Sequence, residues 1–134
     1  NTFRKPSLIG EHEASLWIED GMTVAIGTPH PMGLIRQIIK RGVKIDIVDG
    51  GICLDLLIAA GCVKRSVTYY GGGGFGIPIL PMFRQAIERG GMTVFECDEG
   101  TIMTGLRAAA QSLPFLPWRG GLGTTTHLLQ HGLP

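Results

Sequence analysis

Two acidic side chains at the expected start of a helix are the first residues in this sequence that could do chemistry. Asp98 and Glu99 follow the apolar run 92–95 and precede Gly100 and Thr101. A carboxylate can take a proton from water or attack a carbonyl carbon, so Glu99 is the candidate catalytic residue. Acidic residues at a helix start also cap free N–H groups and complement the helix dipole. We expect capping from Asp98, and both roles are open for Glu99.

Four consecutive glycines, residues 71–74, form a second candidate and are followed by Phe75. Glycines let the backbone approach a ligand closely and offer N–H groups to an anion or a developing oxyanion. A flexible surface loop would have the same composition, so both interpretations are open. The run lacks the Gly-Lys-Ser/Thr of an ATP-binding loop and the spaced glycines of a dinucleotide site, which argues against ATP and NAD.

His30 lies between two prolines, and this position could aim its imidazole into a site. An ordinary loop residue is the alternative. The remaining histidines, at positions 12, 127 and 131, lack metal-ligand spacing, so no metal site is predicted. A serine hydrolase is excluded because there is no Gly-x-Ser-x-Gly motif. Among the basic residues, we expect Lys64 and Arg65 to be solvated, and Arg107 or Arg119 to meet a carboxylate or phosphate.

The elements that must position these residues alternate between helix and strand. Helical spacing of apolar residues is present over 34–39, 82–87 and 102–112. Four helical runs end in glycine just before a β-branched stretch, at Gly21, Gly42, Gly61 and Gly90. This order is typical of helix-to-strand connections in a repeating βα unit. The sequence therefore predicts an α/β fold with an open, mostly parallel sheet and helices on both faces.

In an open parallel sheet, ligands bind outside the carboxyl ends of the strands. The unusual loops of this sequence all follow expected strands and should share that edge. They are residues 27–33, 49–51, 71–76 and 97–101.

Composition limits the class of protein further. The 134 residues are 44% apolar and 17% charged with a net charge of +1, which suits one globular domain and offers no basic stripe for nucleic acid. The three cysteines lie in apolar runs without a CxxC pair, so we expect buried, reduced thiols. No apolar run approaches the ~20 residues of a membrane span, and we expect a cytoplasmic protein without membrane partners.

Several stretches resemble the alpha subunits of type I coenzyme A transferases. Residues 19–27, Glu-Asp-Gly-Met-Thr-Val-Ala-Ile-Gly, are similar to the first strand and glycine loop of that family. Residues 61–65 and 81–90 follow in the family's order. The most specific stretch is 106–124, which contains Leu-Pro-Phe-Leu-Pro and Gly-Leu-Gly-Thr and resembles the glutaconate-transferase branch. The resemblance covers about residues 10–125.

The resemblance implies an open α/β fold and an acyl-CoA substrate, with coenzyme A as substrate and no permanently bound cofactor. It implies a beta-type partner subunit that supplies the nucleophilic glutamate, whose motif is absent here. Family alpha subunits are longer, so it also implies the N-terminal half of such a subunit, with a domain at 1–123 and a poorly defined tail at 124–134. The acyl-binding loops map onto candidate substrate-binding residues Gly27, Thr28, His30, Gly72, Gly73, Gly74 and Phe75.

Several functions are open at this point. The resemblance implies transfer of CoA between carboxylic acids. Many transferases carry glutamine where this chain has Glu99. With its carboxylate at this position, the stretch Asp98-Glu99-Gly100 resembles the branch of the family that hydrolyses CoA thioesters or opens steroid rings. Related sheets also bind sugar phosphates in isomerases and in effector domains of repressors. A domain that only packs against its partner is the last alternative.

Overall fold

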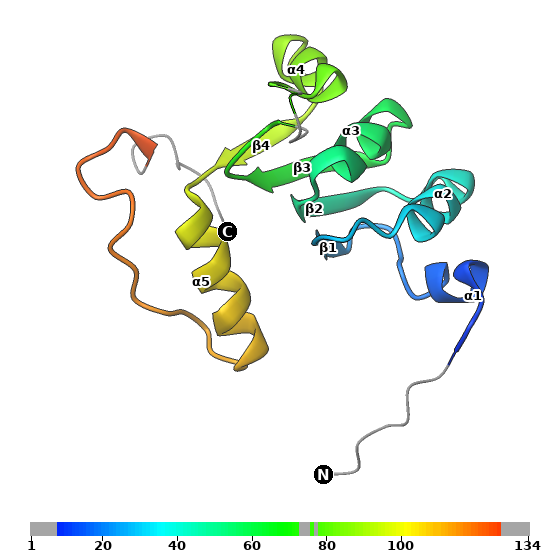
Figure 1. Cartoon of the computed structure of the whole chain (residues 1–134), viewed down its shortest axis with the longest axis horizontal. Helices are drawn as coiled ribbons and strands as arrows, with labels where there is room; N and C mark the ends of the chain where they lie inside the picture. Colours follow the sequence, from blue (N-terminus) through cyan, green and yellow to red (C-terminus); the bar gives the residue numbers. More distant parts are fainter. Residues whose placement is uncertain (1–7, 73–75, 77, 127–134) are drawn as a thin grey trace.

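A sheet of four parallel strands organises the chain (Figure 1). The computed structural model describes residues 8–72, 76 and 78–126. The strands lie side by side in sequence order, and each pair of neighbours is parallel. They are β1 (Thr23–Ile26), β2 (Ile45–Asp49), β3 (Val63–Thr68) and β4 (Thr93–Glu96). The predicted α/β fold with a parallel sheet is therefore confirmed.

The helices cover the two faces of this sheet unequally. They are α1 (Glu11–Ser15), α2 (Met32–Arg41), α3 (Gly51–Ala59), α4 (Pro81–Glu88) and α5 (Glu99–Ala110). Right-handed crossovers between successive neighbouring strands place their connecting helices on the same face. Accordingly, α2, α3 and α4 lie along one face, whereas α5, which follows the last strand, lies on the other (Figure 1).

Local signals explain where these helices end. Gly42 follows α2 with a left-handed φ of 67°, and its N–H donates to the carbonyl of Ile38 at 3.1 Å. Glycine adopts this conformation without the steric cost of a Cβ atom. Gly61 and Gly90, which follow the ends of α3 and α4 by two residues, also have positive φ and confirm two further helix-to-strand connections. Gly21 also has positive φ, but it lies in a turn six residues after α1 ends at Ser15.

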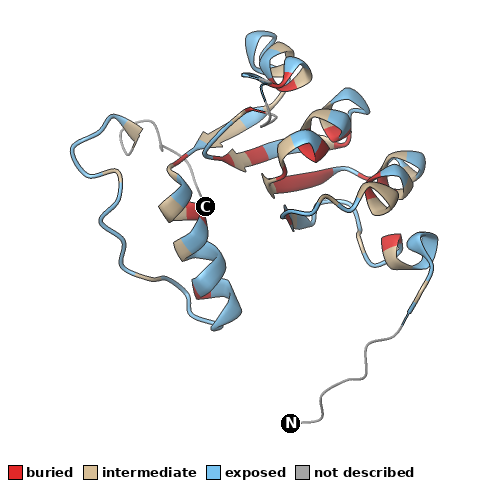
Figure 2. Ribbon diagram, in the orientation of Figure 1, coloured by how far each residue is buried: buried red, intermediate tan, exposed pale blue. Residues whose placement is uncertain are grey.

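The core lies between the sheet and helices α2 to α4. Ile45 and Ile47 on β2 are fully buried, and they pack in one cluster with Ile35 of α2 and Leu54 and Leu57 of α3. Figure 2 shows this buried layer in red, whereas α5 on the opposite face is mostly exposed. Burial of these side chains stabilises the fold by roughly 1.5–3 kcal/mol each relative to exposure.

The cysteines are buried and free, as predicted. Burial is the main cause that raises the pKa of the Cys97 thiol to about 11, and the nearby Asp98 and Glu96 carboxylates add to it. Burial likewise raises the pKa of Cys53 and Cys62. All three side chains are therefore protonated thiols at neutral pH. None of the described helices is long and apolar enough to cross a membrane.

Candidate functional site

The loops singled out from the sequence meet at the carboxyl edge of the sheet. The four strands end at Ile26, Asp49, Thr68 and Glu96, and each of those loops begins within three residues of one of these ends. The hydrogen-bond ladder continues past β4, because the Cys97 N–H donates to the Thr68 carbonyl at 3.1 Å. Helices α3 and α5 begin within two or three residues of this edge and direct their N-termini toward it.

His30 connects the first loop to the second. Gly51 has a φ of 46°, and a Cβ atom added there would lie 3.0 Å from His30 Cε1 and 3.2 Å from His30 Nε2. The imidazole therefore rests against the first residue of α3. Its Nδ1 atom is buried and has no hydrogen-bond partner among the described residues. His30 thus lines the site edge between two loops, while Gly27 and Thr28 of the same loop are exposed.

A tight turn follows β2. Asp49, Gly50 and Gly51 have successive φ values of 61°, 114° and 46°. A left-handed conformation is uncommon for a residue other than glycine, although aspartate adopts it more readily than most. The turn holds the half-buried Asp49 carboxylate at the sheet edge. No role was predicted for Asp49 from the sequence, although an acidic residue followed by two glycines was a usable signal.

Tyr69 lies at this edge, within electrostatic range of two carboxylates. It follows β3 directly and keeps 37% of its surface exposed. Burial raises the pKa of its phenol, and the carboxylates of Asp49 and Glu99 raise it further. The hydroxyl therefore stays protonated at neutral pH. Tyr69 was not among the candidates predicted from the sequence.

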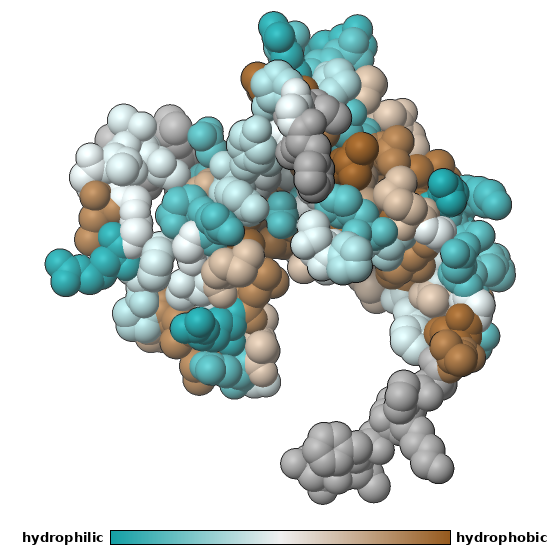
Figure 3. Space-filling model, viewed as in Figure 1, coloured by the Kyte–Doolittle hydropathy of each residue, from teal (hydrophilic) through white to brown (hydrophobic). Residues whose placement is uncertain are grey.

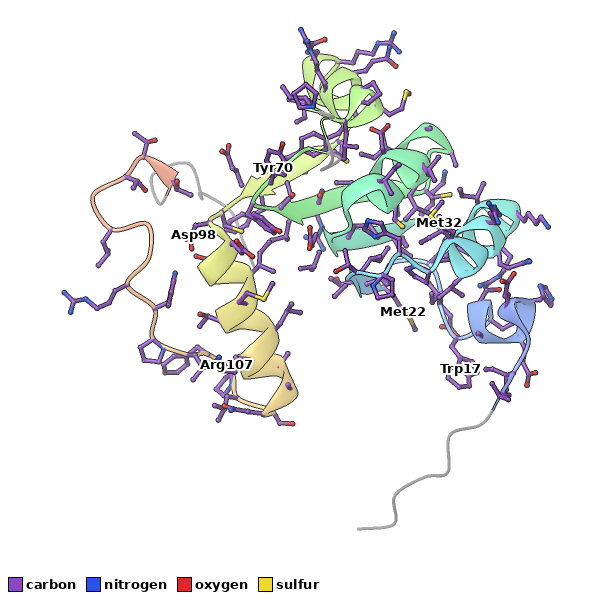
Figure 4. The ribbon with its side chains drawn as sticks, in the orientation of Figure 1. Trp17, Met22, Met32, Tyr70, Asp98 and Arg107 are labelled. Carbon is purple, nitrogen blue, oxygen red and sulfur yellow. The ribbon has the colours of Figure 1, made fainter. Side chains whose placement is uncertain are left out.

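Asp98 caps helix α5, as predicted. Its carboxylate accepts from the Thr101 N–H at 3.0 Å and from the Thr101 hydroxyl at 2.5 Å. These hydrogen bonds are the main cause that lowers the pKa of Asp98, with a further contribution from Trp118. Figure 4 shows Asp98 at the start of α5.

Glu99 is the first residue of α5 and is exposed. Within the described part of the chain, no hydrogen bond to its carboxylate is present. Because Asp98 already caps the helix, the Glu99 side chain is not required for capping. This exposed carboxylate at the ligand edge can take up a proton from a bound water.

Close packing, and not only loop flexibility, accounts for the first two glycines of the tetrad. Gly72 is buried under the ring of Tyr70, and a Cβ atom at Gly71 would lie 2.7 Å from Phe83 Cδ1. The Tyr70 hydroxyl donates to the Pro78 carbonyl at 3.3 Å. The other predicted substrate-binding residues of this loop, Gly73, Gly74 and Phe75, lie outside the described residues.

The basic residues are arranged differently from the sequence expectation. Arg107 lies in the last turn of α5, at the opposite end of the helix from Asp98 (Figure 4). It is therefore remote from the loops. Arg65 is not simply solvated, because it pairs with Asp46 on the neighbouring strand at 2.6 Å. Within the described residues, no group of three or more His, Cys, Asp and Glu side chains could hold a metal.

An apolar groove of 310 Å³ adjoins the first loop. Gly27, Thr28 and Pro29 line its end at the carboxyl edge, and Val24 and Leu34 line its sides. A groove of this kind can hold an apolar part of a ligand whose polar part lies at the loops. Figure 3 shows hydrophobic residues among hydrophilic ones on the right-hand part of the molecule, where α2 and α3 lie.

Known proteins match this chain over most of its length. A family model described as coenzyme A transferase matches residues 11–131. The chain is 40% identical over 121 residues to the cholesterol ring-cleaving hydrolase IpdA subunit of Mycobacterium tuberculosis (strain CDC 1551 / Oshkosh), covering 84% of this chain and 41% of that protein. It is 33% identical over 117 residues to a 3-oxoadipate CoA-transferase subunit of Pseudomonas knackmussii, covering 81% of this chain and 41% of that protein.

The fold has solved counterparts. The crystal structure of glutaconate coenzyme A-transferase from Acidaminococcus fermentans superposes with a TM-score of 0.79 at 23% identity, over 89% of this chain and 40% of that one. This likeness concerns the fold. The chain spans about two fifths of the length of these relatives.

Proposed function

The chain belongs to the coenzyme A transferase family, and on this premise we propose that the carboxyl edge of its sheet binds an acyl-CoA thioester. Coenzyme A is part of the substrate in this proposal, with no permanently bound cofactor. Gly27, Thr28 and His30 border the acyl group in this proposal, together with Gly72 of the glycine tetrad. The family match supports this ligand class over the sugar phosphates that the sequence also left open.

The active protein in this proposal contains a second, beta-type subunit. The names of both relatives describe subunits, which supports a partner for this chain. The enzyme is placed in the cytoplasm, where acyl-CoA substrates occur and where the three free cysteines would stay reduced.

Hydrolytic chemistry through Glu99 is the activity that the site supports best. The observation that carries it is the exposed Glu99 carboxylate at the ligand edge, whose helix is already capped by Asp98. Glu99 takes a proton from water, and the water oxygen adds to a carbonyl carbon of the acyl-CoA. The Tyr69 hydroxyl is the nearby protonated donor for the resulting oxyanion. When the oxyanion collapses, the bond to the leaving group breaks and Glu99 returns the proton to that group.

CoA transfer is the second candidate. The relative whose name describes a CoA-transferase favours it. In this reaction a partner glutamate attacks the thioester, and Glu99 would only orient the substrate. The relative named as a hydrolase has the higher identity to this chain, 40% against 33%. This difference favours hydrolysis or ring opening over CoA transfer.

The test compares Glu99→Gln with Glu13→Gln in the native complex. Glutamine keeps the size of the side chain but cannot take up a proton, so Glu99→Gln should lower turnover by about 100-fold or more. Binding of the acyl-CoA, measured by calorimetry, should change little. Glu13 is exposed on α1, and its variant should behave as the wild type.

Labelled water separates the two reactions. Hydrolysis incorporates one ¹⁸O atom from water into the product without an added acceptor, whereas transfer requires a carboxylic acid acceptor. Full turnover by Glu99→Gln would exclude the catalytic role of this carboxylate.

A further inference from the structure

The segment after α5 turns back along the helix toward its N-terminus (Figure 1). There the indole of Trp118 packs against the backbone of Gly100, the second residue of α5. A Cβ atom added to Gly100 would lie 2.8 Å from Trp118 Cη2, with Cζ2 closer still. A Cβ atom at Gly120 would likewise lie 2.5 Å from Trp118 Cε2. Trp118 therefore packs against two glycines that must lack side chains to admit it.

Trp118 also contacts the other neighbour of Glu99. Its indole lies near the Asp98 carboxylate, the N-cap of α5, and helps to lower the pKa of that carboxyl. One side chain thus touches the residue before Glu99 and the residue after it. Helix capping alone does not require this, because Thr101 already supplies two hydrogen bonds to Asp98.

The exposure of Trp118 argues against a simple core role. Half of its surface, 50%, is exposed, and it is absent from the main core cluster beneath α2 to α4. The two contacts instead define the position of the first turn of α5 relative to the returning segment. A reacting carboxylate must be held close to its productive geometry, and a neighbour that fixes the backbone on both sides of it does this.

We propose that Trp118 is a positioning residue for Glu99, holding the backbone of Asp98 and Gly100 so that the carboxylate faces the acyl-CoA carbonyl. This inference rests on the proposed catalytic role of Glu99. Trp118 does not touch the substrate in this role, so its loss should lower kcat and leave substrate binding nearly unchanged.

A pair of glycine variants in the same helix tests the inference. Gly100→Ala places a methyl group against the Trp118 ring, whereas Gly105→Ala places one in open space, with nothing within 4 Å. Both substitutions favour helix formation. In the native complex, Gly100→Ala should lower kcat by about tenfold or more with KM changed less than threefold, because a displacement near 1 Å can cost as much as a factor of 100. Gly105→Ala should retain wild-type kcat.

A second variant and a spectroscopic measurement complete the test. Trp118→Phe keeps an aromatic ring but removes the indole donor, and it should also lower kcat at unchanged KM. 5-Fluorotryptophan incorporated into this chain alone gives one ¹⁹F resonance each for Trp17 and Trp118. Gly100→Ala should shift the Trp118 resonance and leave that of Trp17 in place.

The outcomes separate this inference from the proposed function. If Glu99→Gln abolishes turnover while Gly100→Ala and Trp118→Phe both retain wild-type kcat, the positioning role is overturned and the function stands. If Glu99→Gln retains turnover, the proposed hydrolytic function fails, and the positioning of a catalytic Glu99 fails with it. Loss of kcat in Glu99→Gln, Gly100→Ala and Trp118→Phe, but not in Gly105→Ala, supports the inference.

Discussion

Arg65 and Asp46 form an ion pair across strands β3 and β2, with Arg65 Nη2 and Nε at 2.6 and 2.9 Å from Asp46 Oδ2. Both side chains lie on the sheet face that carries α5, opposite the main core. The Asp46 side chain is only 12% exposed, whereas that of Arg65 is 54% exposed. The pair therefore satisfies a nearly buried carboxylate outside the main core cluster.

We expect Asp46→Asn to lower the thermal midpoint of unfolding by several degrees. The amide leaves the guanidinium without its charged acceptor and stays desolvated itself. Glu88→Gln is the control, because it removes the exposed Arg84–Glu88 pair, whose side chains are 65% and 59% exposed. Exposed pairs contribute little, so this control should hardly move the midpoint. Equal effects of the two variants would contradict the importance of the Asp46–Arg65 pair.

Replacing two buried serines by alanine should change the free energy of unfolding in opposite directions. Ser66 is fully buried in β3, and its hydroxyl has no hydrogen-bond partner among the described residues. Removing an unsatisfied hydroxyl relieves its desolvation, so Ser66→Ala should raise the free energy of unfolding by about 1 kcal/mol. Ser15 is equally buried but donates to the His12 carbonyl at 2.7 Å. Ser15→Ala should therefore lower it by about 1 kcal/mol in urea titrations. A loss of stability in Ser66→Ala would disprove the expected gain.

Because the pKa of the Cys97 thiol is raised, we expect the folded chain to lose stability at high pH. Its pKa rises from 9.0 to about 11 in the folded chain, so the folded state holds the proton more tightly than the unfolded state. This stabilisation is complete below pH 9 and is lost as the pH rises from 9 toward 11, by about 2–3 kcal/mol in all. Urea titrations at pH 8 and at pH 11 measure it. Because Cys53 and Cys62 also titrate, the prediction concerns the difference from Cys97→Ala, whose stability should fall less over this range.

Local signals predicted the connections of the fold well. The glycines that end helical runs and the apolar spacing of α2 and α4 depend on a few neighbouring residues, and these predictions are confirmed. The start of α5 at Asp98 was also predictable, since a capping side chain acts over three residues. Helix α3 was not identified by its spacing, because its residues are apolar on nearly all sides and show no period.

The composition of the site could not be predicted to the same extent. The Tyr69 phenol feels the charges of Asp49 and Glu99 because three separate strands end at one edge, and nothing in the sequence near Tyr69 indicates this. Likewise, Trp118 reaches Gly100 only because the chain turns back after α5. Such contacts depend on residues far apart in the sequence, whereas the place of Glu99 at the start of a helix after a strand depends only on its neighbours.

The role of Gly27 in substrate binding is open to a direct test. A Cβ atom at Gly27 would have nothing within 4 Å, and its φ is not in the left-handed region, so Gly27→Ala should leave the unfolding midpoint unchanged. The same methyl group would project where an acyl-CoA must approach the first loop. We therefore expect the Kd for the acyl-CoA to rise by at least about fivefold, the ratio that 1 kcal/mol produces. Gly105→Ala is the control, because that glycine also has open space but lies within α5, away from the first loop. Equal affinities of the two variants would show that the substrate does not approach Gly27.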